Sequence, residues 1–177
     1  MHRLKKGLVQ VYTGNGKGKT TAAIGQAIRA AGHSLRVYMI QFMKDQPNSG
    51  ELKIIQKLKP NFIIKQYGQP SFFNEKNPKK ADFEIVQKAW NATERIVRSG
   101  KWDIVILDEI NVVLNYKLIS LEKVVELIKS KPSHVELIFT GRNAHPEILK
   151  LADLVSEILE IKHPYEKNMM PRVGIEV

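Results

Sequence analysis

Short apolar segments of strand length alternate along the chain with segments of helical periodicity, and this alternation constrains the fold more than any other feature. The strand-like segments span residues 8–12, 36–42, 61–65, 103–108, 135–140 and 155–161. The helix-like segments span residues 19–31, 49–58, 79–99 and 146–152, and one more helix is capped by Ser120, with Leu121, Val124, Val125 and Ile128 on one face. This order predicts an α/β fold of three layers, in which helices cover both sides of a mostly parallel sheet.

The length and composition of the chain fit one globular domain. At 177 residues the chain has the length of about one domain, so we expect a single domain over residues 1–177. No stretch approaches 18 apolar residues, which predicts that a membrane is not a partner. The basic N-terminus leads into a strand-like segment and not into a secretory core, which predicts a cytoplasmic location. The absence of cysteine excludes disulfides, thiolate metal sites and a cysteine nucleophile.

Positive charge is the one unusual feature of the composition. The chain has 28 Lys and Arg against 18 Asp and Glu, a net charge of +10. Such a surface attracts nucleotides, nucleic acids and acidic proteins, or it simply keeps the protein soluble. Because no nucleic-acid motif and no interleaving of aromatic with basic residues occurs, we expect no nucleic-acid partner.

A glycine-rich loop separates the first predicted strand from the first predicted helix. Residues 13–21 read TGNGKGKTT and end in the Gly-Lys-Thr of the phosphate-binding pattern G-x-x-x-x-G-K-[ST]. Thr13 stands where that pattern has its first glycine, and Gly14 follows one position later. Backbone N–H groups of such a loop surround phosphate oxygens, and the start of the helix adds partial positive charge. The loop therefore predicts a nucleoside triphosphate site, with Lys19 on the phosphates and Thr20 on Mg²⁺.

The other residues of this loop are candidates for nucleotide contact. They are Gly14, Asn15, Gly16, Lys17, Gly18 and Thr21. Two interpretations stand for Lys17: it contacts phosphate, or it is a solvated lysine of the loop.

Two adjacent carboxylates, Asp108 and Glu109, end the most apolar predicted strand. In phosphate-loop enzymes an aspartate at this place holds the Mg²⁺ shell, directly or through water, so we assign Asp108 to the metal. Glu109 has three possible roles: general base, Mg²⁺ ligand or nucleotide contact. No GTPase base-reading motif and no protein-kinase motif set occurs, so a plain ATPase with Glu109 as base is the alternative reading among nucleotide enzymes.

Several segments together resemble the phosphate-loop ATP:corrinoid adenosyltransferases. They are TGNGKGKTTAA at 13–23, QF at 41–42, ILDEIN at 106–111, FTGRN at 139–143 and KHPY at 162–165. The threonine in place of the first glycine is similar to the loop of this family. The resemblance implies a RecA-like phosphate-loop fold and transfer of the 5′-deoxyadenosyl group of ATP to the cobalt of a reduced corrinoid, with triphosphate as the second product.

The resemblance also implies cofactors, partners and catalytic residues. The co-substrate would be ATP, the substrate a corrinoid such as cobalamin, and the metal Mg²⁺, held by Thr20, Asp108 and Glu109. Because Co(I) is itself a strong nucleophile, the protein need only stabilise the departing triphosphate, so Lys19 and Glu109 are the catalytic candidates. A flavodoxin-type reductant and a homodimer are the other expected partners.

Aromatic residues in a turn-rich stretch are the candidates for the corrinoid side. Phe72 and Phe73 lie within residues 68–78, and they either exclude water from the cobalt or fill a hydrophobic gap. Residues 1–6 alone precede the first strand, whereas longer enterobacterial members have a segment that folds over the corrinoid. We therefore expect a lid from elsewhere or a looser closure.

Arg142 and His163 are further candidates for the site. Arg142 follows the strand of residues 135–140, at the edge where open α/β sheets bind ligands, so we favour a ligand role over an ion pair with Asp153. No Asp-x-His-x-x-Gly string occurs, and we propose no histidine as a cobalt ligand. His163 lines the site or supports the structure around it.

Overall fold

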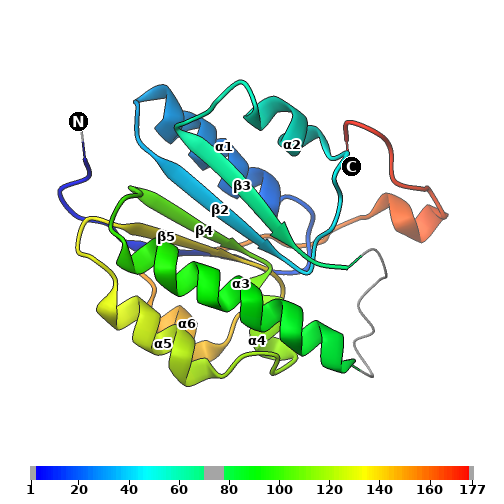
Figure 1. Cartoon of the computed structure of the whole chain (residues 1–177). Coiled ribbons are helices and arrows are strands. Elements are labelled where there is room, and N and C mark those ends of the chain that lie inside the picture. Colours follow the sequence, from blue (N-terminus) through cyan, green and yellow to red (C-terminus); the bar gives the residue numbers. More distant parts are fainter. Residues whose placement is uncertain (1–2, 70–77, 176–177) are drawn as a thin grey trace.

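Six parallel strands form one sheet in the computed structural model, which describes residues 3–69 and 78–175. The strands lie in the order β3-β2-β4-β5-β1-β6 (Figure 1). They are β1 (Val9–Thr13), β2 (Val37–Phe42), β3 (Phe62–Tyr67), β4 (Ile104–Asp108), β5 (Glu136–Thr140) and β6 (Leu154–Glu157). The parallel sheet confirms the predicted α/β class.

Helices cover both faces of this sheet (Figure 1). The helices α1 (Lys19–Gly32) and α2 (Gly50–Ile55) lie on one face, and α3 (Lys80–Arg98), α4 (Ile110–Asn115), α5 (Leu121–Ser130) and α6 (Pro146–Leu151) lie on the other. Each face has its own hydrophobic core. The Ala23 and Ala27 side chains of α1 are fully buried, and their small size brings the start of this helix close to the sheet. The three predicted layers are therefore present.

The order of the strands decides which side chains meet at the carboxyl edge of the sheet. Strand β5 lies between β1 and β4 and pairs with both. Because all strands run in the same direction, the ends of these three strands, Thr13, Asp108 and Thr140, lie at one edge. The loop after β1 thereby lies within reach of Asp108, as in a phosphate-loop nucleotide-binding fold.

The last strand is shorter than the apolar pattern predicts. The pattern favours a strand over residues 155–161, but β6 ends at Glu157, opposite Thr13. Beyond that point Ile158 turns its backbone groups to the loop after β1, donating to Thr13 O at 2.9 Å and accepting from Gly16 N–H at 2.8 Å. These long-range contacts end the regular pairing.

Two short elements and one cap differ from the prediction. Helix α4 follows β4 directly, and a 3₁₀ helix, η1 (Pro164–Lys167), lies in the C-terminal segment; neither carries enough periodic residues to be predicted. Ser120 precedes α5 as expected, but its side chain makes no capping hydrogen bond.

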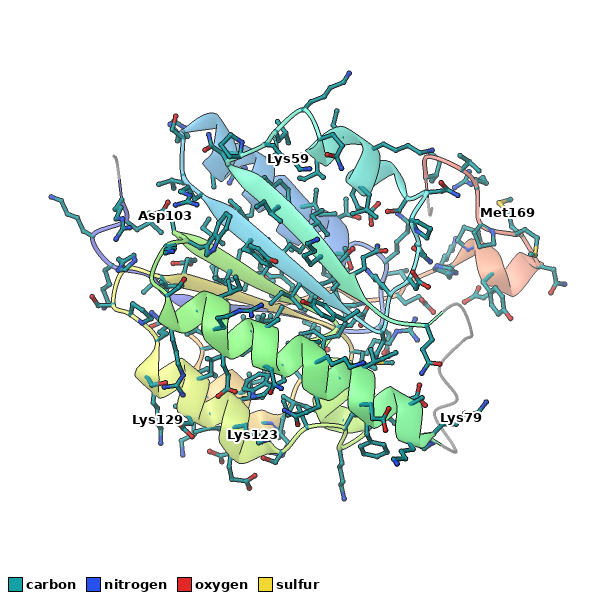
Figure 2. The ribbon with its side chains drawn as sticks, viewed as in Figure 1. Lys59, Lys79, Asp103, Lys123, Lys129 and Met169 are labelled. Carbon is teal, nitrogen blue, oxygen red and sulfur yellow. The ribbon has the colours of Figure 1, made fainter. Side chains whose placement is uncertain are left out.

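Charged side chains surround the outside of the molecule. In Figure 2 Lys79 and Lys129 lie toward the edge of the view, Lys123 lies on α5, and Lys59 lies beside the start of β3. All four are exposed. In the described part of the chain, no helix combines the length and the apolar character that a membrane crossing requires.

Candidate nucleotide-binding site

The loop between β1 and α1 shows why the first glycine of the phosphate-binding pattern is displaced. Thr13 is the last residue of β1, and its hydroxyl accepts a hydrogen bond from Ala144 N–H at 3.2 Å, a contact that glycine cannot make. The turn begins one residue later, at Gly14, whose φ is 95°. Only glycine adopts that conformation readily. The shift of one position therefore keeps the turn and adds a tie to the loop after β5.

The C-terminal segment packs directly on this loop. Besides the two backbone hydrogen bonds to Ile158, a Cβ at Gly16 would lie only 2.5 Å from the carbonyl oxygen of Leu159. No larger side chain fits at Gly16 without moving this backbone. Gly14 and Gly16 thus admit the segment that holds the loop in place.

Lys19 opens helix α1 and folds back over the loop. Its ammonium donates to Gly16 O at 2.6 Å, and its exposed fraction is 9%. Burial lowers the pKa of Lys19, while the nearby carboxylate of Glu109 acts in the opposite direction. The loop therefore holds a partly desolvated cation at the start of the helix, where an anion is also favoured by the helix dipole.

Asp108 is fully buried and accepts four hydrogen bonds from other side chains. Its Oδ1 accepts from the hydroxyls of Thr20 at 2.8 Å and Thr140 at 2.6 Å. Its Oδ2 accepts from the Gln41 amide at 3.1 Å and from the Lys44 ammonium at 2.6 Å. The predicted partners Thr20 and Asp108 are therefore in direct contact, although they are far apart in the sequence.

The oxygen atoms of Thr20 and Asp108 suit Mg²⁺, which prefers hydroxyl, carboxylate, water and phosphate ligands. Within residues 3–69 and 78–175, no three acidic or histidine side chains gather into a cluster that would hold a metal ion.

Glu109 lies beside Asp108 in an uncommon backbone conformation. Its φ is 66°, and its N–H donates to the Thr140 hydroxyl at 3.0 Å. Burial raises the pKa of Glu109, the charge of Asp108 raises it further, and Lys44 and Lys19 oppose the shift. A non-glycine residue at positive φ is often held there for function. The structure places Glu109 at the site and leaves its three possible roles open.

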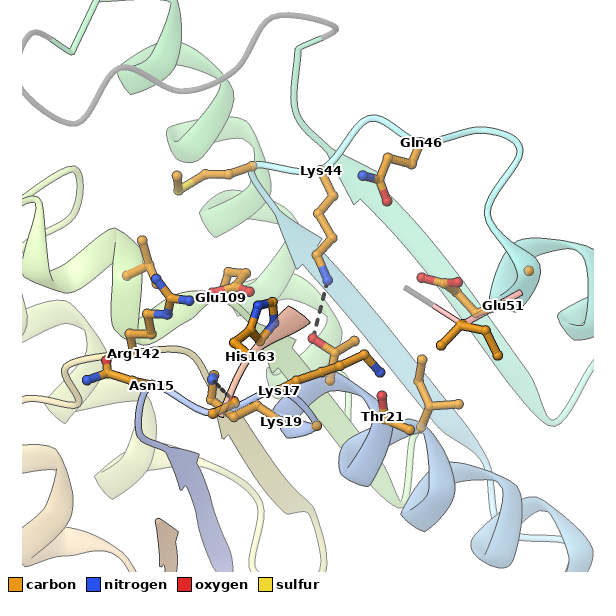
Figure 3. A pocket seen from close by; sticks show the side chains of 18 of the residues that line it. Asn15, Lys17, Lys19, Thr21, Lys44, Gln46, Glu51, Glu109, Arg142 and His163 are labelled. Carbon is orange, nitrogen blue, oxygen red and sulfur yellow. Dashed lines mark hydrogen bonds between the residues drawn. The ribbon is translucent and has the colours of Figure 1, made fainter. Parts of the chain in front are cut away.

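A cavity of about 790 Å³ opens above these residues at the carboxyl edge of the sheet (Figure 3). Among its lining residues are those that the sequence predicts for the nucleotide: Asn15, Gly16, Lys17, Gly18, Lys19, Thr20, Thr21, Glu109 and Arg142. Gly14 and Asp108 do not line it: Gly14 packs on Ile158, and Asp108 lies buried behind Thr20. Phe72 and Phe73 lie outside the described residues.

The structure separates the alternatives for Arg142. Arg142 is exposed and lines the cavity, whereas the carboxylate of Asp153 accepts from Val9 N–H at 2.8 Å. Within the described part of the chain, an ion pair between Arg142 and Asp153 is not formed. His163 also lines the cavity, while its Nδ1 accepts from Tyr165 N–H at 3.2 Å, so it both borders the site and supports the local turn.

Gln41, Lys44 and Thr140 contact Asp108, and the sequence motifs give none of them a role at the site. Lys44 follows the end of β2, and Thr140 is the last residue of β5. Burial by itself would lower the pKa of Lys44, but the charge and hydrogen bond of Asp108 outweigh it, and that pKa is raised. Arg142 is a candidate because residues just after a parallel strand lie where open α/β sheets bind ligands. Lys44 lies just after β2, so the same argument predicts it as a candidate.

Comparisons with known proteins identify the family of this chain. Residues 5–177 match the model of the family described as ATP:corrinoid adenosyltransferase BtuR/CobO/CobP. The corrinoid adenosyltransferase of Escherichia coli K12 is 35% identical over 172 residues, which cover 97% of this chain and 86% of that protein. The corrinoid adenosyltransferase CobA of Salmonella typhimurium LT2 is 36% identical over the same shares, and the corrinoid adenosyltransferase of Pseudomonas aeruginosa is 29% identical over 98% of this chain and 85% of that protein. The chain therefore belongs to the ATP:corrinoid adenosyltransferase family, and by this membership it is a transferase.

Proposed function

We propose that this chain transfers the 5′-deoxyadenosyl group of ATP to the Co(I) centre of a reduced corrinoid and releases triphosphate. The observation that carries the proposal is the site itself: a phosphate loop with Lys19 at its centre and the Thr20–Asp108 pair beside it, facing a basic cavity. Family membership supplies the substrate class.

The protein forms no covalent bond with the substrates in this reaction. The electron pair of Co(I) attacks C5′ of the ribose, a Co–C bond forms, and the C5′–O bond breaks so that its electrons leave with the triphosphate. The protein must hold that triphosphate and stabilise its growing charge. Four basic side chains line the cavity and supply positive charge to stabilise the triphosphate: Lys17, Lys19, Lys44 and Arg142.

Mg²⁺ belongs to the proposal as the metal of the triphosphate. Thr20 and Asp108 would hold it, and when bound it supplies positive charge to the leaving group. We assign Glu109 to the same site, where the positive charges of Lys19 and Arg142 oppose the rise in the pKa of its carboxyl group. Backbone N–H groups of the loop other than that of Gly16, which donates to Ile158 O, complete the binding of phosphate.

The corrinoid side of the proposal comes from the resemblance. Phe72 and Phe73 remain the candidates for an apolar wall against the cobalt. The described part of the cavity adds apolar contacts from Ile24, Met43 and Val112. Replacing either phenylalanine by alanine should lower activity only for a corrinoid whose cobalt must first lose an axial ligand.

One incubation separates adenosyl transfer from ATP hydrolysis. The protein is mixed with ATP, Mg²⁺ and chemically reduced cobalamin, and the phosphorus product is identified. We expect triphosphate in equal amount to a light-sensitive Co–C product. ADP and phosphate without that product would overturn the proposal and favour a hydrolase with Glu109 as base. A reaction without protein is the control for chemical transfer.

The expected partners complete the proposal. We propose a homodimer, and its support is the exposure of apolar residues along the edge strand β6, where Leu154 and Val155 are 42% and 45% exposed. We also propose an acidic flavodoxin-type reductant, which the net charge of +10 favours. Sedimentation equilibrium tests the dimer, and a monomer at micromolar concentration would contradict it.

A further inference from the structure

Lys44 bridges the two side chains that the proposed function gives to the metal ion. Its ammonium lies 2.6 Å from Asp108 Oδ2 and 3.3 Å from Thr20 Oγ1 (Figure 3 shows Lys44 reaching toward the phosphate loop). An ammonium and a hydrated divalent cation compete for the same oxygen lone pairs. Lys44 and a metal ion cannot both satisfy these atoms in this arrangement.

The backbone around Lys44 is built to place this side chain. Met43 has a φ of 58°, and its N–H donates to Tyr67 O at 2.7 Å. Gly68 packs so closely that a Cβ there would lie 2.5 Å from the carbonyl oxygen of Lys44. The side chain of Lys44 is 21% exposed. The backbone of Lys44 is therefore held in place at the site, and its side chain is not that of a freely solvated surface lysine.

Of the four donors to Asp108, Lys44 is the one that can leave. Thr20 and Thr140 have short side chains at the ends of regular elements, so a change of rotamer carries their hydroxyls over a much smaller distance than a lysine ammonium can cover. Gln41 is fully buried and is held by a second hydrogen bond from Gln66 at 2.9 Å. Lys44 has a long flexible side chain that also lines the cavity, so its ammonium can turn toward an anion there.

We propose that Lys44 is an exchangeable counter-ion: it neutralises Asp108 before nucleotide binds and moves to the triphosphate when the nucleotide brings its metal. The inference rests on the proposed metal site, and it adds a coupling between metal binding and nucleotide binding. Nucleotide removes the competing ammonium, so nucleotide strengthens metal binding and, by linkage, metal strengthens nucleotide binding. Lys44 is a positioning residue for charge, and it makes metal loading depend on nucleotide.

Metal binding without nucleotide tests this exchange directly. Mn²⁺ is titrated into the wild-type protein, Lys44→Met and Lys44→Gln, and free Mn²⁺ is followed by electron paramagnetic resonance. We expect both variants to bind Mn²⁺ about tenfold more tightly than the wild type, because a cation has left the carboxylate. Lys17→Met is the matched control: it also removes one lysine charge from the cavity lining, and among the described residues Lys17 makes no hydrogen bond to Asp108. We expect a change of less than about threefold for it.

The same titration with ATP present, corrected by a protein-free series for the Mn²⁺ that ATP binds in solution, supplies the second readout. We expect the Lys44 variants and the wild type to bind Mn²⁺ equally tightly in the presence of ATP, because the ammonium of the wild type has then moved to the triphosphate. We also expect ATP itself to bind the variants about tenfold more weakly than the wild type. If the Lys44 variants bind Mn²⁺ alone no more tightly than the wild type, while Mn²⁺ with ATP binds all proteins, the exchange is wrong and the metal site stands. If Mn²⁺ binds none of the proteins even with ATP, the metal site and the exchange both fail.

Discussion

The two ends of strand β4 carry buried aspartates in opposite kinds of surroundings. Asp103, just before the strand, accepts from Arg36 N–H at 2.8 Å through its carboxylate. Asp108, at the other end, accepts from side chains only among residues 3–69 and 78–175: those of Thr20, Thr140, Gln41 and Lys44. Their exposed fractions are nearly equal, 4% and 0%.

Burial therefore does not distinguish a structural carboxylate from a functional one. The amino edge of the sheet also buries Glu136, whose carboxylate accepts from Leu8 N–H and from the Gln10 amide. The backbone donors Arg36 N–H and Leu8 N–H are fixed, so these carboxylates hold chain segments together. The donors to Asp108 at the carboxyl edge are side chains with a cavity beside them, and there we propose that one partner is exchanged.

The largest effect should come from removing Lys19. We expect Lys19→Ala to lower kcat/KM for adenosyl transfer about 100-fold to 1000-fold, because the growing charge of the triphosphate loses its central cation. Steady-state kinetics with chemically reduced cobalamin measures this change. Lys123→Ala, on the exposed face of α5, is the control and should keep its activity. Near-native turnover of Lys19→Ala would show that the active site does not lie at the carboxyl edge of the sheet.

Asp108→Ala should lower kcat/KM about 10-fold to 100-fold, the usual cost of losing a residue that supports a metal. The loss should shrink when the Mg²⁺ concentration is raised, because weaker metal binding is then partly restored by mass action. Activity measured across a Mg²⁺ series checks this. A loss that is the same at every Mg²⁺ concentration would exclude Asp108 from the metal shell.

Asp103→Ala should show the opposite pattern. It leaves Arg36 N–H without its acceptor, which should lower the free energy of unfolding by about 1–3 kcal/mol. The kcat of the folded protein should stay within about twofold of the wild type. Urea unfolding and kinetics on the same preparation measure both quantities. If Asp103→Ala loses more kcat than Asp108→Ala, the contrast between the two edges is wrong.

Glu109→Gln should alter how stability depends on pH. The pKa of Glu109 is raised in the folded state by burial and by Asp108. At a pH below the ordinary carboxyl pKa both states hold the proton. As the pH rises, the unfolded state releases its proton first, so the carboxyl of Glu109 lowers the free energy of unfolding increasingly until the pH passes its raised pKa, and the full penalty remains at higher pH.

We therefore expect Glu109→Gln to raise the unfolding temperature at pH 7. We expect little effect near pH 3.5, because this pH lies below the ordinary glutamate pKa of about 4.3. Calorimetry over this pH range measures the difference. Glu122→Gln, at an exposed position of α5, is the control. A gain of equal size at both pH values would show that charge at Glu109 is not the cause.

The smallest effect concerns the outer surface and not either edge of the sheet. With an acidic protein reductant, the rate should fall several-fold when salt rises from about 50 to 300 mM, because the net charge of +10 is screened. With a chemical reductant the fall should be clearly smaller. Equal salt dependence in both assays would remove the argument for electrostatic docking of the reductant.

The sequence by itself determined the local parts of this molecule. The alternation of strand and helix patterns predicted the α/β class, and the spacing of Gly18, Lys19 and Thr20 between a strand and a helix predicted the phosphate loop. The same logic placed Asp108 at the end of a buried strand. These features follow from residues that are close in sequence, so local sterics and periodicity reveal them. The single domain over residues 1–177 and the roles of the site residues stay predictions.

Only the tertiary structure decided which of these parts meet. Lys44 contacts Asp108 across 64 positions in the sequence, and Thr140 reaches it because β5 lies between β1 and β4. The same holds for the C-terminal segment, which ends β6 early at Glu157 to pack on Gly16. The order of strands in a sheet is a property of the whole packed core, and no short stretch of sequence specifies it. The chain therefore reveals the phosphate loop on its own, while the partners of Asp108 appear only when the sheet is assembled.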